Sequence, residues 1–388
     1  MRVATILLIG LAALVPAAIA SAQPALAQTY SSAVAAYERG DYAAAYRGYR
    51  RLAERGHARA QVNLGNMYRE AKGVPLDDAE AVRWYRRAAE QGDAIGQANL
   101  GTMYWLGRGV PRNDAEAVRW FRRAAEQGNA LAQAKLGNMY LYGRGVQRDD
   151  AEGVRWYRRA AEQRYAKAQY TLGLLYAKGR GVPRDDTKAV RWTRRAAERG
   201  LAEAQQDLGI RYANGRGVPQ DAAEAVRWIR RAARQGYAKA QYSLGLMYAS
   251  GRGVPRDSGE AARWVIRAAK GGSPKALFYL GFYSEKRKKP NLVQAYAFYS
   301  LAASAPDAKV RSKAAAGMRR VGQRMTPGAM TRARRLALAW RTKNLKARSA
   351  AARPRMQQSR QAPQRQPVSS APGREEGEDA PESFGGDR

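Results

Sequence analysis

The amino-acid sequence predicts an all-α protein built from tandem helix–turn–helix repeats. Tryptophan recurs every 36 residues, and Leu-Gly pairs recur with the same step. Each unit contains two stretches with apolar residues at helical spacing, separated by a short segment rich in glycine and proline. A period this regular indicates one array of repeats and not several separate domains. The tryptophans are Trp84, Trp120, Trp156, Trp192, Trp228 and Trp264.

The first 27 residues have the features of a secretory signal peptide. Arg2 precedes the apolar run "ATILLIGLAALV", and small residues lead to Ala27. Pro16 interrupts the apolar stretch, and a membrane-spanning helix needs about 20 apolar residues without such a break. We therefore expect cleavage after Ala27, with Ala20 and Ala22 as alternative positions and an uncleaved anchor as the weaker interpretation. The expected location is the periplasm, with secretion from the cell as the alternative.

Residues 28–56 are expected to form an N-terminal capping repeat. The stretch "AAYERGDYAAAYRGYRRLAERG" keeps the helical pattern, but Gly40-Asp41-Tyr42 replaces the long turn. An end repeat has no neighbour on its outer side, and its sequence departs from the others for that reason.

Residues 57–272 contain the regular units, whose turn is seen in "GRGVPRDD", starting at Gly179. A glycine ends the first helix, Val182 fills the core, Pro183 prevents continuation and Asp185 caps the second helix. A phosphate-binding loop would follow a strand and end in Gly-Lys-Ser or Gly-Lys-Thr, and neither is present. The segment is therefore predicted to be a turn. In most repeats a glutamate three residues after the cap predicts a capping box. In the repeat of Asp185 this position holds Lys188, so we expect the start of that helix to be less stable.

The repeating pattern "A-x-x-x-L-G-x-x-Y-x-x-G-x-G-V-P-x-D-x-x-x-A-V-x-W-x-x-x-A-A-E-x-G" resembles the Sel-one-like repeat, a relative of the tetratricopeptide repeat. The resemblance implies a right-handed α-solenoid whose concave face is lined by the first helix of each pair. It also implies an adaptor or regulator that binds other proteins, in bacterial envelopes among other places, and does not act as an enzyme.

The C-terminal part departs from the regular pattern. Residues 273–342 are expected to form a degenerate terminal repeat and a helical cap, whose last helix starts at Thr326-Pro327. Residues 343–388 are rich in arginine, glutamine and proline and end in an acidic tip, which predicts a disordered basic tail. The tail is open to two interpretations, contact with an anionic ligand or a solubilising extension without a partner.

Three columns of residues are expected to line the concave face, when the Leu-Gly pair is equated with its tetratricopeptide counterpart. These columns vary between repeats while the core columns do not, and we interpret that variation as a mark of surface. Trp105, Leu141 and Tyr142 stand out, because elsewhere their columns mostly hold small or polar residues. They are interpreted as anchors for a partner peptide or helix, with packing against the next repeat as the alternative. The expected partner-binding residues are Asn66, Arg69, Thr102, Trp105, Asn138, Leu141, Tyr142 and Leu174.

The formal net charge of +36 suggests a second function, the binding of anionic ligands. Arginines recur in columns on the second helices, and no Asp or Glu occurs from Lys309 to Arg374. The chain is thus a candidate binder of anionic envelope polymers or lipid head groups, while nucleic acid is not the expected partner. For the arginine doublets, however, we favour a solvated face on which Arg86 and Arg87 pair with Glu90.

Little in the sequence points to catalysis. The chain has no cysteine, and His57, its one histidine, occupies a helix-start position. No isolated carboxylate pair and no serine in a nucleophile elbow is present. We therefore expect no catalytic, metal or cofactor site, and a monomer that binds its partner through the solenoid.

Overall fold

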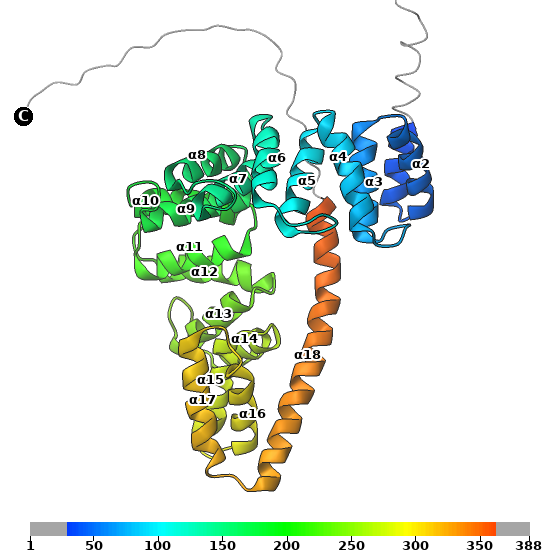
Figure 1. The fold of residues 1–388 in the computed structure, drawn as a ribbon. Helices are drawn as coiled ribbons and strands as arrows, with labels where there is room; N and C mark the ends of the chain where they lie inside the picture. The colour runs from blue at the N-terminus through cyan, green and yellow to red at the C-terminus, as the bar shows by residue number, and fades with distance from the viewer. Residues whose placement is uncertain (1–28, 362–388) are drawn as a thin grey trace, which may run out of the picture. The chain divides into compact units, whose positions relative to one another are not determined.

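The computed structural model describes residues 29–361 and the surroundings of side chains up to residue 344. Every regular element in this range is an α-helix, and the helices follow one another in tandem pairs (Figure 1). This confirms the predicted all-α repeat architecture, an α-solenoid. The expected signal peptide, residues 1–27, lies outside the described residues, so export and cleavage stay predictions.

The described chain forms two compact units that divide within helix α15, after Leu280. The first unit contains helical residues 29–38, followed by α2 (Tyr42–Glu54), α3 (Ala58–Glu70), α4 (Asp78–Glu90), α5 (Ala94–Leu106), α6 (Asp114–Glu126), α7 (Ala130–Tyr142), α8 (Asp150–Glu162), α9 (Ala166–Lys178), α10 (Asp186–Glu198), α11 (Ala202–Asn214), α12 (Ala222–Arg234), α13 (Ala238–Ser250), α14 (Ser258–Lys270) and the start of α15 (Pro274–Lys286). The second unit contains the rest of α15, then α16 (Leu292–Ala302), α17 (Ala308–Gly322) and α18 (Pro327–Gln361).

The two helices of each repeat approach closely at the Leu-Gly pair. A Cβ atom added to Gly137 would lie 2.8 Å from the ring of Tyr157 on the next helix. Contacts that short do not occur between real side chains, so the ring can lie against the backbone of α7 only because this residue is glycine. Leu136 beside it is fully buried. The constant spacing of the Leu-Gly pairs along the chain therefore reflects the packing of the two helices in each repeat.

The glycine-rich segment is a turn, as predicted. Gly179 ends α9 with φ +65°, and Gly181 has φ +69°. A Cβ on Gly181 would lie 2.2 Å from the carbonyl oxygen of Asp150, in the second helix of the preceding repeat. The second glycine thus serves the contact between repeats as well as the turn itself.

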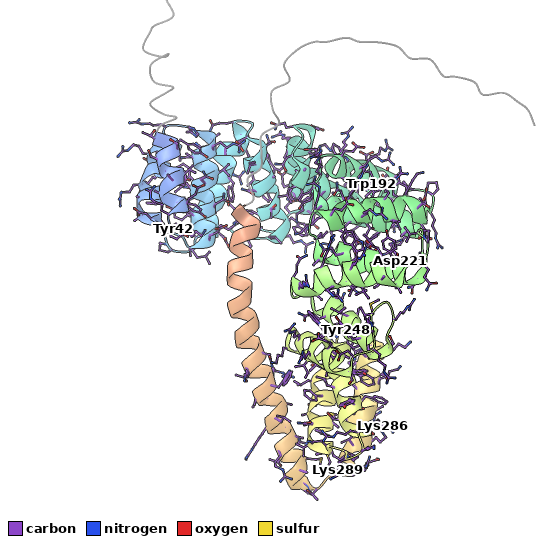
Figure 2. All side chains as sticks on the ribbon, turned by 180° about the vertical axis from the view of Figure 1, so that it is seen from behind. Tyr42, Trp192, Asp221, Tyr248, Lys286 and Lys289 are labelled. Carbon is purple, nitrogen blue, oxygen red and sulfur yellow. The ribbon has the colours of Figure 1, made fainter. Side chains whose placement is uncertain are left out.

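The second helices are capped, but the predicted capping box forms only in part. The side chain of Asp221, labelled in Figure 2, accepts from the backbone N–H of Glu224 at 2.8 Å. The backbone N–H of Asp221 donates to the carbonyl of Tyr212 instead of the glutamate, which pairs with Arg227 at 3.1 Å. Because the preceding helix satisfies this N–H, the glutamate is not needed there. Asp185 keeps its cap bond in the repeat that lacks the glutamate.

The second unit is held by a buried carboxylate. Glu285 on α15 is 4% exposed and accepts two hydrogen bonds of 2.7 Å from Arg320 on α17. The hydroxyl of Tyr299 on α16 donates a third bond, at 2.8 Å. The Arg320 guanidinium, followed by the Tyr299 hydroxyl, holds the pKa of the Glu285 carboxyl below its usual range. One charged group thereby joins three helices.

The last helix starts at Pro327, as expected, and runs to Gln361. It continues past residue 343, where composition predicted the tail to begin. Alanine, arginine and glutamine in this stretch have high helix propensity, which the composition argument did not weigh. Residues 362–388 lie outside the described part of the chain.

Replacing Arg164 with glycine is expected to stabilise the fold by about 0.5–1 kcal/mol. Arg164 follows α8 with φ +65°, a position where the other repeats have glycine. Relief of left-handed strain exceeds the extra freedom that glycine gives the unfolded chain. Denaturant unfolding of Arg164→Gly checks this. Gly128→Arg is the matched control, because Gly128 has φ +85° and open space for a Cβ, and it should lose a similar amount. Unchanged stability in both variants would contradict the assigned cost.

Glu285→Gln is expected to lower the melting temperature at pH 7, by an amount that shrinks in acid. The folded pKa of Glu285 is lowered, so its contribution is present above the ordinary value of 4.5 and is lost as pH falls through the folded pKa. Thermal melts of both proteins from pH 7 to pH 3 measure the difference. Glu54→Gln, which removes an exposed pair with Arg50, should have little effect at any pH. A difference that stays constant with pH would refute the assignment.

Candidate functional site

The first expected column, which follows the Leu-Gly pair, belongs partly to the core. Asn66 is half-buried, and its side-chain oxygen accepts a 2.7 Å hydrogen bond from the hydroxyl of Tyr85. At the equivalent place in the next repeat Phe121 has no hydroxyl to satisfy, and Thr102 donates to the carbonyl of Ala98 at 2.8 Å. The column residue therefore matches the aromatic residue that it faces.

The same rule holds further along the array. Burial raises the pKa of Tyr157, and a hydrogen bond with Asn138 opposes that rise. Where Thr193 replaces the aromatic residue, the column holds the half-buried Leu174. Variation in this column follows its core partner, so our interpretation of all variation as a mark of surface is wrong here. The signal that reveals it is the constant 19-residue spacing between the two members of each pair.

Leu141 is a correction to the expected binding surface. It is 3% exposed, and a Cβ added to Gly153 would lie 2.9 Å from its Cδ2 atom. The other regular repeats have alanine at the position of Gly153, for example Ala117 and Ala189. Leu141 fills the space that this glycine leaves on α8. Packing accounts for this residue, but the contact with Gly153 lies within one repeat, whereas the alternative considered from sequence was packing against the next repeat.

Arg69 lies at the N-terminal end of the array in a charged cluster. It is half-buried and pairs with Glu70 at 3.1 Å. Lys72 pairs with the same carboxylate at 3.4 Å, and the hydroxyl of Tyr37 donates to it. The ion pair with Glu70 thus holds the Arg69 side chain within the protein.

One aromatic side chain of the expected set is exposed and a second is partly exposed. Tyr142, at the end of α7, is 58% exposed. Trp105, one position earlier in the last turn of α5, is half-buried and packs in part against the core of its repeat. Leu106 beside Trp105 is 48% exposed. We call Trp105, Leu106 and Tyr142 the aromatic patch. They occupy the same end of the first helices of neighbouring repeats.

Each ring of the aromatic patch is covered by a cation. The ammonium of Lys135 lies 4.2 Å from the centre of the Trp105 ring, and burial lowers the pKa of this lysine. The guanidinium of Arg180 lies 5.1 Å from the centre of the Tyr142 ring. Asp150 holds Arg180 by two hydrogen bonds of 3.0 and 3.1 Å. The patch therefore combines apolar surface with positive charge that is fixed in place.

The arginine doublets of the second helices are engaged within the solenoid. Arg158 donates to the hydroxyl of Tyr176 at 2.9 Å, and the guanidinium of Arg159 lies 4.6 Å from the centre of the Trp156 ring. The same arrangement recurs at Tyr248, labelled in Figure 2, which accepts from Arg230. Within residues 29–344 no ion pair joins the first doublet to Glu90, so that expected pairing is wrong. The third arginine column pairs with glutamates three residues earlier, at Arg83, Arg119, Arg155, Arg227 and Arg263.

The described residues contain no group of three or more side chains suited to hold a metal ion. His57 caps α3: its Nδ1 accepts from the backbone N–H of Ala60 at 3.2 Å, and its ring stacks on Tyr30. No helix between residues 29 and 361 is long and apolar enough to cross a membrane.

Comparison with known proteins identifies the repeat. The Sel1 repeat matches residues 58–93, 94–129, 130–165, 166–201, 202–237, 238–273 and 274–307. A crystal structure of a Sel1 repeat protein from Oxalobacter formigenes is 35% identical, with a TM-score of 0.56, over 62% of this chain and 96% of that one. The protective antigen c5321 of uropathogenic Escherichia coli is 28% identical over 91% of this chain and 90% of its own, with a TM-score of 0.41. No curated protein matches the chain.

Leu141 and Gly153 are expected to show strong coupling in a double-mutant cycle. Leu141→Ala alone leaves a cavity and should cost about 2–3 kcal/mol. Gly153→Ala alone overpacks against Leu141 and should cost about 1–3 kcal/mol. The double variant restores the pair found in other repeats, such as Ala177 with Ala189, and should be at least about 1 kcal/mol more stable than additivity predicts. Denaturant unfolding measures all four proteins, and simple additivity would contradict the pairing.

Proposed function

Because the chain belongs to the Sel1 repeat family, a typical protein-interaction scaffold, we propose that it binds and modulates a partner protein in the cell envelope. The binding surface is the concave face of the solenoid, centred on the aromatic patch. The protein acts as an adaptor or regulator and does not catalyse a reaction. The observation that carries the proposal is the exposure of Leu106 and Tyr142, beside the half-buried Trp105, in repeats whose other large side chains pack inward.

The chemistry of the patch defines the kind of partner that fits. Trp and Tyr side chains contribute large contact area and are enriched among residues that dominate binding energy. Lys135 and Arg180 lie over the two rings and favour a segment that carries acidic residues beside its apolar ones. A peptide or helix with both kinds of residue is the proposed ligand.

The envelope location rests on the signal-like residues 1–27, with their apolar run and small residues before Ala27. The second candidate, binding of anionic polymers, rests on the net charge of +36. The arginine doublets favour it less than the sequence suggested, because their guanidinium groups already bind tyrosine and tryptophan side chains.

The two functions differ in how binding depends on salt. Binding to polyanions weakens steeply as ionic strength rises, whereas burial of aromatic side chains is much less sensitive. The test is affinity capture from an envelope extract of cells that produce the chain, at low and moderate salt. The baits are the wild type, the double variant Trp105→Ala with Tyr142→Ala, and the control Leu76→Ala, which removes a side chain that is 60% exposed on a turn.

We expect wild type and control to retain a discrete protein at moderate salt and the double variant to lose it. Because Tyr142 is exposed and Trp105 half-buried, the double variant should fold, which a thermal melt checks. Retention of the same polyanions by all three baits, with release as salt rises, would contradict the proposal and support the polymer-binding function.

A further inference from the structure

A second candidate site lies away from the aromatic patch. A cavity of about 750 Å³ opens where the C-terminal ends of α8 and α10 meet α9. Arg164, Arg195 and Arg199 line it together with Glu162, Glu198 and Gln169. Its volume falls within the range of small-ligand sites, and its lining is polar.

Two residues of this cavity differ from the residue that most repeats have at the same position. Arg164 stands where the other repeats have glycine and keeps the left-handed backbone of that position, with φ +65°. Arg199 stands where Gln127, Gln163 and Gln235 stand in other repeats. Both changes introduce a guanidinium group, and both groups line the same cavity. The stability of the fold explains neither, since the first adds backbone strain and the second removes a hydrogen bond.

The lost hydrogen bond belongs to a ladder of buried glutamines. In four other repeats the glutamine on the first helix accepts at Oε1 from a glutamine at the end of the second helix of the same repeat. For example, Gln163 donates to Gln133 at 2.8 Å, and Gln235 donates to Gln205 at 2.8 Å. The equivalent donor for Gln169 would come from position 199, which is arginine.

Gln169 is therefore left with an unsatisfied acceptor. Its Nε2 donates to the carbonyl of Ala161 at 3.0 Å, which fixes the orientation of the amide. Its Oε1 is buried and has no hydrogen-bond partner among the described residues, although the residue is only 3% exposed. An unpaired acceptor at this depth costs free energy. The Oε1 atom of Gln241 is unpaired as well, in the repeat that has Gly271 at the donor position, so the missing donor marks a ligand site only together with the cavity and its arginines. Oε1 of Gln169 has almost no solvent-accessible surface, so neighbouring side chains must move aside before a hydrogen-bond donor on a ligand in the cavity can reach it and remove that cost.

The charges in the cavity favour an anionic ligand. Arg164 and Arg199 form no ion pair among residues 29–344. Arg195 lies 4.6 Å from the centre of the ring of Trp192, which is labelled in Figure 2, and the stacking fixes its direction. Three arginines outnumber the two glutamates that share the cavity.

We propose that this cavity binds an α-carboxylate whose adjacent amide N–H donates to Oε1 of Gln169. Arginine side chains grip a carboxylate with paired hydrogen bonds, and Arg164 and Arg199 have that capacity free. The donor and the anion then come from one amino-acid residue, as at the C-terminus of a peptide or in an N-acylated amino acid. An inorganic anion such as sulfate has no donor, and an acidic side chain has no N–H on the carbon that bears its carboxylate. The site adds a second ligand to the proposed scaffold and does not depend on the aromatic patch.

Calorimetric titration of the full-length protein with N-acetyl-glycyl-alanine tests the proposal. Two matched probes remove one feature each: the C-terminal amide removes the carboxylate, and N-acetyl-glycyl-N-methylalanine removes the N–H. Each is expected to bind at least tenfold more weakly than the free acid. An internal segment of the same sequence within a longer peptide should not bind, whereas a protein ending in Gly-Ala should bind like the dipeptide, which separates a peptide C-terminus from a free small molecule as the source.

Two variants replace the arginines with the residues of other repeats. Arg199→Gln supplies Gln169 with the partner that the other repeats have, and Arg164→Gly removes the left-handed arginine. Both are expected to bind the acid at least tenfold more weakly while they retain or gain stability, so loss of binding does not reflect misfolding. Arg234→Gln, an exposed arginine at the end of α12, is the matched control and should bind like wild type, as should the Trp105→Ala, Tyr142→Ala variant.

Several results would overturn the proposal. Absence of binding by the free acid, equal binding of the amide or the N-methyl probe, or unchanged binding in Arg199→Gln would each do so. If the protein bound phosphate or glucuronate as tightly as N-acetyl-glycyl-alanine, the cavity would be a general anion site and not one that recognises the amide N–H.

Discussion

The solenoid depends on a close contact between two helices that is possible only because the residue at the contact is glycine and has no side chain. In each repeat the glycine of the Leu-Gly pair allows a side chain of the second helix to lie against the backbone of the first, as Tyr157 does at Gly137. This approach sets the distance between the two helices. It also decides what the neighbouring positions do: the residue before the glycine enters the core, and the residue after it, such as Asn138, must suit the ring that lies across it. One missing Cβ atom thus fixes three columns of the sequence.

Large exposed side chains begin just over one turn beyond this contact, at Leu106 and Tyr142. Leu141, one position nearer, is buried, and its counterpart Trp105 is half-buried against the core. Cations lie over the rings of Trp105 and Tyr142. Most of the positive charge of the array is used differently. Arginines of the second helices cover tryptophan rings and bind tyrosine hydroxyls of the neighbouring helix. They therefore contribute to packing between helices and also give the surface its positive charge. High net charge and the proposed protein-binding surface are therefore compatible in one scaffold.

Backbone-encoded features could be predicted from the sequence, because glycine, proline and helix-capping residues have local requirements. The turn at Gly179 and Gly181 and the cap at Asp185 were predicted correctly for that reason. Pairs that meet only in three dimensions were missed. The match of Asn66 to Tyr85, and of Leu141 to Gly153, depends on which side chains face each other across two helices. The interpretation that variable positions are free of packing failed at these pairs, because both members of a pair vary together.

A repeat protein supplies its own internal standard for judging an unusual residue. When a departure is matched by a second departure that restores packing or hydrogen bonding, as Leu141 is by Gly153, selection for stability is a sufficient explanation. Arg164 and Arg199 behave in the opposite way. The first places a side chain in a left-handed turn, the second leaves Oε1 of Gln169 without a donor, and no other residue in the described array restores what is lost. Each cost also occurs alone elsewhere in the array, since Ala71 has a left-handed backbone with φ +54° and Oε1 of Gln241 lacks a donor. The meeting of both costs and of two added guanidinium groups at one cavity supports the proposed ligand, while a compensated pair indicates only the fold.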